Sequence, residues 1–307
     1  MRGSLIAGWI VASCVVFGWT EPGHAADQPA LHYFPSGSIY EYRWKLLEIA
    51  LAHAEIALAH AEIAPAHRAD SGGPVRLEPY PEDVTQNRGV ALVESGAIDV
   101  IALGTNEERE AKLLPVRIDI LRGIVGFRLL VIRADDQARI AAIDAAALRS
   151  RLTFGLNSQW ADLPILRANG FTVVASPSHE NLFGMLTAGR FDAFPRGLNE
   201  ARRELAGHQG AFPQLAIERT KALFFPYPVY YWVNRNNSAL ARRIETGLER
   251  ALSDGSFRAL FEAYHRADLA ETGVGGRHVV RLDNPFLPAG TPPPDTSWWW
   301  PEEAVTR

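Results

Sequence analysis

The sequence predicts an α/β protein in which strands and helices alternate along most of the chain. Short apolar runs rich in branched residues, such as 127–133, predict buried strands. Segments of helical periodicity lie between them, and the segment 85–95 ends at Gly96, a residue typical of helix ends. With 307 residues, 47% of them apolar, the chain can form one large domain or two lobes of ordinary size. Alternating strands and helices favour parallel sheets covered by helices.

The individual elements follow from the same patterns. The predicted strands cover residues 31–34, 75–80, 99–103, 127–133, 152–155, 172–175, 191–194 and 230–233. The predicted helices cover residues 40–64, 85–95, 161–169, 179–188, 239–253 and 257–264, with another after Gly197. The first helix contains a repeat, because the unit LAHAEIA at 51–57 recurs at 58–64. A seven-residue insertion rotates a helix face by only about 20°, so the apolar face survives the duplication.

The N-terminus has the pattern of a secretion signal. Arg2 gives a positive start, an apolar run follows over 5–17, and small residues precede a predicted cleavage after Ala25 or Ala26. The run is shorter than the roughly 20 residues that span a bilayer. Cys14, the single cysteine, lies inside this run in a context that resembles a lipoprotein box, so lipidation at Cys14 is the alternative. Residues 1–25 are therefore predicted to be a signal peptide that directs the chain to the periplasm.

Charge and composition exclude several classes of partner and cofactor. Charged residues make up 21% of the chain and the net charge is −4, which gives no reason to expect nucleic acid or an anionic membrane as partner. His53, His60 and His67 recur every seven residues, which places neighbours about 10.5 Å apart on a helix, too far to share one metal ion. We therefore expect no metal site and no cofactor.

The chain ends in a segment rich in proline and tryptophan. From Arg277 the alternation stops, and six prolines between 285 and 301 exclude a packed helix. Residues 277–307 are predicted to form an extended tail. The run Trp298-Trp299-Trp300 either docks this tail on the body, which we favour, or forms an exposed patch for a partner.

Three ordered segments carry a resemblance to a known family. Residues 96–109 (GAIDVIALGTNEER) contain a buried strand, a polar turn and an arginine, residues 186–193 read LTAGRFDA, and residues 248–261 contain DGSFRALF. In this order and spacing they resemble the type II periplasmic binding proteins, specifically solute-binding protein family 3, the relatives of amino-acid-binding proteins. The resemblance covers about residues 31–264.

The resemblance implies a two-lobed Venus-flytrap fold, with each lobe a mostly parallel sheet flanked by helices. One lobe comprises residues 27–128 and 230–276, and the other comprises residues 129–229. Two strands that cross the hinge, near 127–133 and 230–233, join the lobes. The ligand binds in the cleft and closure of the hinge buries it.

Residues after the first-lobe strand are the first candidates for the site. Arg109 matches the family arginine that holds a ligand carboxylate, which a planar guanidinium does with two parallel hydrogen bonds. The alternative is a surface arginine paired with a neighbouring glutamate. Gly104, Thr105 and Asn106 lie at the same strand end, where backbone N–H groups and a hydroxyl suit an anion, or form an ordinary turn.

The second lobe supplies further candidates. Ser158 and Trp160 lie in a polar loop that opens a helix, where free N–H groups favour an anion. Ser158 could instead only cap the helix, and Trp160 could fill the core. Aromatic residues cluster at the predicted rim, and among them we select Tyr40 and Tyr227.

The chain departs from the family at the aspartate that holds the ligand's ammonium group. Gly197, or Arg196 beside it, takes that position here, and an arginine repels an ammonium group. Arg196 facing Arg109 suits an organic acid or another anion, although Glu200, one turn further on, can still receive an ammonium. The alternative for Arg196 is an ion pair with Glu200 at i+4.

The predicted function is capture of a small polar, anionic ligand, an organic acid or an amino-acid-like molecule, for an ABC-type importer or a sensor. The partners would be that ligand and a membrane permease or sensor. A dehydratase-like enzyme on the same fold is the second hypothesis, with Glu107, Glu108 and Glu200 as candidate acids or bases, although they form no recognisable constellation with a histidine. A non-transport interaction module that binds through its tail is the third.

Overall fold

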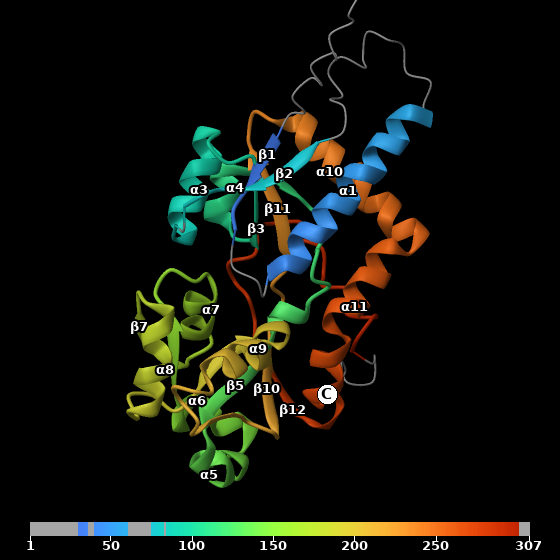
Figure 1. Ribbon diagram of the computed structural model, residues 1–307. Coiled ribbons are helices and arrows are strands. Elements are labelled where there is room, and N and C mark those ends of the chain that lie inside the picture. Colours follow the sequence, from blue (N-terminus) through green and yellow to red (C-terminus); the bar gives the residue numbers. More distant parts are fainter. Residues whose placement is uncertain (1–29, 36–39, 61–74, 83, 301–307) are drawn as a thin grey trace, which may run out of the picture.

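The computed structural model describes residues 30–35, 40–60, 75–82 and 84–300 (Figure 1). The predicted signal peptide with Cys14, most of the second LAHAEIA unit and His67 lie outside these residues. In the described part of the chain, none of the helices combines the length and the apolar composition that crossing a bilayer requires.

The first lobe is built on a five-stranded sheet, drawn in the upper half of Figure 1. Its strands, in spatial order, are β2 (Arg76–Pro79), β1 (Ala30–Tyr33), β3 (Val100–Gly104), β11 (Val229–Asn234) and β4 (Leu113–Val116). The helices are α1 (Glu41–His60), α3 (Gln86–Ser95), α4 (Glu107–Lys112), α10 (Ser238–Asp254) and α11 (Ser256–Glu271). Helix α3 begins at its cap Thr85 and ends at Gly96, as the sequence predicts.

The second lobe contains two sheets. The larger has the order β12 (His278–Arg281), β10 (Lys221–Phe224), β5 (Phe127–Arg133) and β8 (Phe194–Gly197), and β9 (Leu215–Ile217) also pairs with β5. The smaller pairs β6 (Thr153–Asn157) with β7 (Thr172–Ser176). The helices are α5 (Gln137–Ala141), α6 (Leu148–Arg151), α7 (Asp162–Ala168), α8 (His179–Thr187) and α9 (Leu198–His208). Short 3-10 helices cover Ile124–Gly126, Ala134–Asp136, Ala145–Ala147 and Val274–Gly276.

The two-lobed α/β class is therefore confirmed, but the sheets are mixed instead of mostly parallel. Strand β11 is antiparallel to both β3 and β4, and β5 is antiparallel to β8, β9 and β10. The physical reason is that β5 and β11 each enter their sheet directly from the opposite lobe, so no crossover helix sets their direction.

The connections between the lobes also differ from the prediction. Strands β5 and β11 each pair within one lobe, and the chain crosses in the segments 117–126 and 225–228 beside them. Asp119 ties the two crossings together, because its carboxylate accepts hydrogen bonds from the backbone N–H groups of Leu121, Gly123 and Val229. A third crossing leads from α11 in the first lobe to β12 in the second.

The C-terminal segment is partly strand, which corrects the prediction of an extended tail from Arg277. His278–Arg281 forms β12 and pairs in parallel with β10, a strand that the sequence analysis missed. Beyond it the chain docks on the body as we favoured. Trp300 is only 2% exposed and packs in a cluster with Phe127 and Phe224.

Candidate functional site

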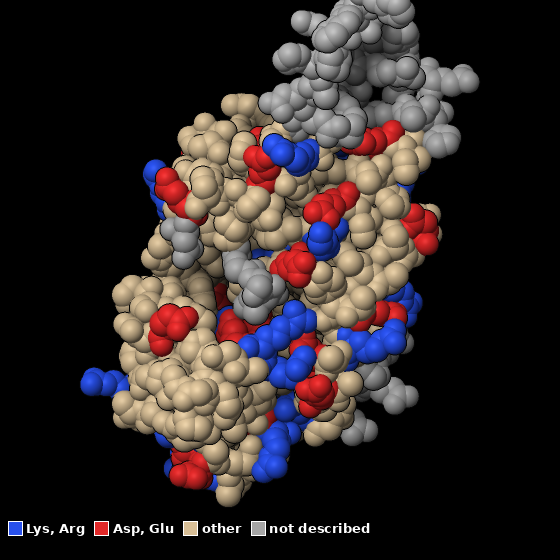
Figure 2. Space-filling model, viewed as in Figure 1, with Lys and Arg blue, Asp and Glu red and all other residues tan. Residues whose placement is uncertain are grey.

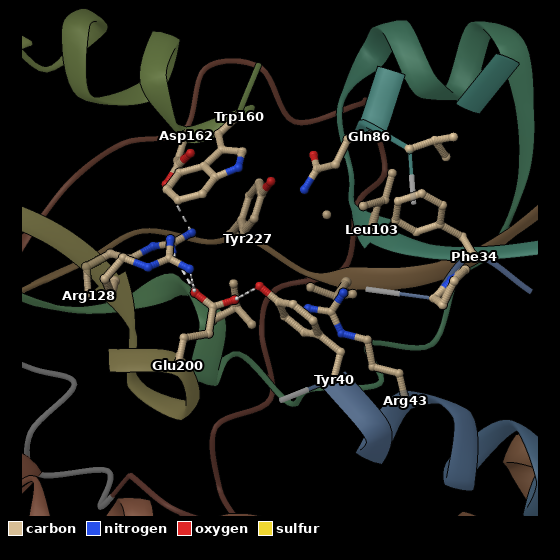
Figure 3. A pocket seen from close by; sticks show the side chains of 16 residues that line it. Phe34, Tyr40, Arg43, Gln86, Leu103, Arg128, Trp160, Asp162, Glu200 and Tyr227 are labelled. Atoms are coloured by element: carbon tan, nitrogen blue, oxygen red, sulfur yellow. Dashed lines mark hydrogen bonds and ion pairs between the residues drawn. The ribbon is translucent and has the colours of Figure 1, made fainter. Parts of the chain in front are cut away.

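A cavity of about 230 Å³ lies between the two lobes and is lined by both (Figure 3). Space-filling atoms show acidic and basic side chains gathered where the lobes meet on the face drawn in Figure 2. The first lobe contributes Phe34, Pro35, Tyr40, Arg43, Val84, Gln86, Leu103, Gly104 and Val229. The second lobe and the crossing segments contribute Val125, Arg128, Trp160, Asp162, Arg196, Glu200 and Tyr227. We call this the inner cavity.

Arg128 supplies a buried positive charge that its neighbours compensate only loosely. It lies on β5 and is 3% exposed. Its Nη2 is 3.4 Å from Asp162 Oδ2 and its Nη1 is 3.8 Å from Glu200 Oε2, both longer than a good hydrogen bond. Its Nε has no hydrogen-bond partner within the described part of the chain. Such a guanidinium can still donate short hydrogen bonds to an anion.

Arg43 is the matching cation from the first lobe. It lies on α1, and its Nη1 donates to the carbonyl of Ala102 at 2.9 Å. Its guanidinium carbon lies 4.2 Å from the ring centre of Tyr40, which fixes its direction. Its Nε also finds no hydrogen-bond partner among the residues described. Figure 3 shows Arg43 and Arg128 on different sides of the cavity.

Two carboxylates of the second lobe lie beside Arg128. Asp162 opens α7 and is 2% exposed, and its Oδ1 accepts no hydrogen bond from any described residue. Glu200 accepts from the backbone N–H of Gly197 at 3.1 Å and from the Tyr40 hydroxyl at 3.4 Å. Burial, and then Glu200 and Glu204, raise the pKa of Tyr40, so its hydroxyl remains a donor at neutral pH. The cavity therefore offers charges of both signs.

Arg196 lines the inner cavity but is occupied within the second lobe. Its Nε and Nη2 donate to the two carboxylate oxygens of Glu204 at 2.5 and 2.6 Å, and Nη2 also lies 2.9 Å from Glu200. The i+4 pair that we considered as the alternative is thus present. The guanidinium carbon lies 4.3 Å from the ring centre of Trp160, so Arg196 supports the wall that Trp160 forms.

A second, outer cavity of about 360 Å³ adjoins the first and shares Trp160 with it. It contains Asn106, Arg109 and Ser158 among its lining residues. Arg109 is 6% exposed, and its guanidinium donates to the carbonyl of Gly104 and, at 3.5 Å, to Gln86 Oε1.

The remaining candidates of these two loops have local roles. Asn106 caps α4 by accepting from the backbone N–H of Arg109 at 2.8 Å. Thr105 is buried, and its hydroxyl donates to Glu110 Oε1 at 3.5 Å. Helix α7 begins only at Asp162, with Ala161 as its cap residue, so Ser158 does not cap that helix.

The structure thus divides the predicted residues between two cavities, except Thr105, which lines neither of them. Tyr40, Trp160, Arg196 and Tyr227 come together at the inner one, and Asn106, Arg109 and Ser158 join Trp160 at the outer one. The ring of Tyr227 lies so close over Gly104 that a Cβ there would come within 2.2 Å of it. Sequence reasoning missed Arg43, Arg128 and Asp162. A signal for Arg128 existed, since it is a charge inside the apolar strand FRLLVIR.

The three glutamates considered for catalysis also separate. Glu200 lines the inner cavity, whereas Glu108 lines the outer one and binds Lys112 at 2.7 Å. Glu107 is exposed at the start of α4. Within the described ranges no three His, Cys, Asp or Glu side chains are grouped so that they could hold a metal ion.

Comparison with known proteins defines the fold. No protein-family profile and no curated protein matches the sequence. An ancestral arginine-binding protein bound to glutamine superposes with a TM-score of 0.54 at 17% identity, over 78% of this chain and 98% of that chain. A histidine kinase sensor domain with similarity to periplasmic binding proteins gives 0.52 at 14% identity, over 77% and 95%. An ancestral amino acid-binding protein, a precursor of cyclohexadienyl dehydratase, gives 0.51 at 12% identity, over 77% and 94%.

Proposed function

We propose that this chain, whose fold is that of the two-lobed periplasmic binding proteins, captures a small polar ligand in the inner cavity. The observation that carries the proposal is that buried charged residues of both signs, Arg43 from the first lobe and Arg128 and Asp162 from the second, line the same cavity. A cavity lined by buried guanidinium and carboxylate groups favours a polar ligand that supplies both donors and acceptors.

The proposed ligand carries a carboxylate, as in an organic acid or an amino-acid-like molecule. We assign the carboxylate to Arg128 and Arg43, because both line the inner cavity, whereas Arg196 is held there by Glu204 and Glu200 and Arg109 lines the outer cavity. An ammonium group, where the ligand has one, would lie at the carboxylate of Asp162, which lines the inner cavity. This assignment replaces the family's aspartate with a carboxylate from the start of α7.

The proposed setting is the periplasm, with delivery to a membrane permease or signalling through a sensor. The fold supports both uses, since one similar structure is an arginine-binding protein and another is a sensor domain of a histidine kinase. Fold alone does not decide between them, because one fold hosts several functions. The pattern of the first 25 residues is the support for export.

A thermal-shift screen against organic acids, amino acids and sugars tests the proposal. A ligand at about 100 times its Kd adds about 2.7 kcal/mol of stability. We expect Arg128→Met to abolish the shift that a carboxylate ligand produces, and Asp162→Asn to weaken only ligands with an ammonium group. Arg266→Met is the control, since the Arg266 side chain is 77% exposed on α11. A folded Arg128→Met protein that keeps the full shift would show that the site is assigned wrongly.

Catalysis is the second candidate, and the position of Glu200 in the inner cavity favours it. The carboxylate accepts from Tyr40 and lies beside Arg128, so both a proton carrier and a cation face the same space. Following each bound compound by NMR over time separates the two functions. A binding protein returns the compound unchanged, whereas a dehydratase-like enzyme releases a product, and Glu200→Gln would stop that release.

A further inference from the structure

The C-terminal segment beyond β12 runs from the second lobe onto the first crossing between the lobes. At the start of the segment, the backbone N–H of Leu282 donates to the carbonyl of Phe224 at 2.8 Å. The side-chain amide of Asn284 donates to the carbonyl of Pro226 at 2.8 Å. Further along, Asp295 forms an ion pair with Arg122. The Trp299 indole N–H donates to the carbonyl of Arg122 at 2.7 Å. We call residues 282–300 the strap.

Two residues near the end of the strap are anchored on different lobes. Trp298 packs with ring centres 5.4 Å from both Phe257 and Phe261, which are buried on α11 beside α1 and α10 of the first lobe. The guanidinium carbon of Arg122 lies 4.4 Å from the ring centre of Trp298. The first anchor is therefore an aromatic pocket of the first lobe.

The second anchor belongs to the sheet of β5, β10 and β12. Trp300 lies 4.7 Å from the ring centre of Phe224 and 5.2 Å from that of Phe127, and it is 2% exposed. Arg281 of β12 lies 5.0 Å from its ring centre. Only one residue, Trp299, separates this anchor from Trp298.

We propose that the strap is a restraint that limits how far the two lobes separate. Two residues of extended chain span at most about 7 Å, so a short link anchored at both ends leaves little room for relative movement. Rotation of the lobes must either pivot at Trp298-Trp299-Trp300 or remove one ring from its pocket. Removal exposes a large aromatic surface to water, which opposes opening.

The helix α11 reinforces the strap. Its Asp268 is fully buried and pairs with Arg202 at 2.9 Å and Arg203 at 3.0 Å, both on α9 of the second lobe. Figure 1 shows α11 running beside both lobes, on the side away from α7 and α8. The strap and the ion pairs between α11 and α9 both join the lobes without a ligand. The test therefore needs no ligand.

The distance between the lobes can be measured with two nitroxide labels. Ala91 on α3 and Ala168 on α7 are exposed in different lobes, so Ala91→Cys and Ala168→Cys in a Cys14→Ser background supply the sites. We expect Trp298→Ala to broaden the distance distribution toward longer values in pulsed electron resonance. Phe286→Ala is the matched control, because Phe286 is an aromatic residue of the same strap that is 38% exposed, and it should leave the distribution unchanged.

A second variant keeps both anchors and tests the short link itself. A Gly-Ser insertion between Trp298 and Trp299 retains each ring but lengthens the chain between them, and we expect it to broaden the distribution as Trp298→Ala does. If both variants fold cooperatively and both give the distance distribution of the parent protein, the strap does not restrain the lobes. If Trp298→Ala does not fold, the insertion alone decides.

Discussion

Arg196 and Glu204 form a bidentate ion pair inside the second lobe, with N–O distances of 2.5 and 2.6 Å. Both residues are about 95% buried, at 3% and 6% exposed. The pair holds Arg196 beside Trp160, with the guanidinium carbon 4.3 Å from the ring centre, and Trp160 forms a wall of both cavities. A pair deep inside the lobe thus sets the position of a residue at the cleft.

Removal of one partner from this pair should destabilise the protein strongly. Glu204→Gln leaves a buried guanidinium without its main counter-ion, which typically costs about 3–5 kcal/mol. Urea unfolding followed by circular dichroism measures the loss. Glu108→Gln breaks the exposed pair with Lys112 and should change stability little. Equal effects of the two substitutions would contradict a special role for the buried pair.

The pair also illustrates what the sequence could and could not predict. The i+4 spacing suggested contact between Arg196 and Glu200, and the contact is present, although it joins the end of β8 to the first turn of α9 and not two positions on one helix face. The bond to Glu204 was missed, since Arg196 lies in β8 before the helix and its direction depends on the sheet. The charge of Arg196 was therefore assigned to the ligand when the protein itself compensates it.

Elements with strong local patterns were predicted closely, whereas those defined by long-range pairing were not. The segment 127–133 was predicted with its observed bounds, and α3 with its cap residues. Strand β12 was missed because it exists only through pairing with β10, itself a short strand after a turn. Arg43 and Arg128 were missed for the same reason, since only the folded chain places a helix of one lobe opposite a strand of the other.

The stability of the protein should fall in acid as Glu204 takes up a proton. Burial alone would raise the pKa of Glu204, but Arg196, and then His179, whose Nε2 lies 3.6 Å from Glu204 Oε2, lower it from 4.5 to about 2. A depressed carboxyl pKa contributes stability that is present above the unfolded value and is lost as the pH falls from 4.5 through 2. The difference in unfolding free energy between the parent and Glu204→Gln should therefore shrink over this range. A difference that stays constant to pH 2 would contradict the assignment.

His265 should lower the free energy of unfolding at a less acidic pH than Glu204 does, beginning near pH 6.5. The ring is 1% exposed, neither nitrogen has a hydrogen-bond partner among the described residues, and burial, with Arg203 and Arg43, lowers its pKa to about 3. The unfolded chain binds a proton below pH 6.5 that the folded chain refuses, so stability falls as the pH drops from 6.5 toward 3.

Replacement of His265 isolates this contribution. His265→Leu should gain about 2 kcal/mol relative to the parent between pH 8 and pH 5, because only the unfolded parent is protonated there. His278→Gln is the control, since His278 is exposed on β12 and should leave the pH dependence unchanged. Urea unfolding at both pH values measures the effect. An unchanged pH dependence in His265→Leu would show that the buried ring is protonated in the folded protein.

Two glycines within helices should respond to alanine with opposite signs. A Cβ at Gly247 on α10 would lie 1.8 Å from the carbonyl oxygen of Ala50 on α1, so the two helices of the first lobe would have to separate. Overpacking of this kind costs about 1–3 kcal/mol, which outweighs the gain in helix propensity of up to about 1 kcal/mol. A Cβ at Gly207 on α9 meets nothing within 4 Å, so Gly207→Ala should keep that gain and raise the midpoint of thermal unfolding. If Gly247→Ala is as stable as Gly207→Ala, the close approach of α1 and α10 does not depend on the missing side chain.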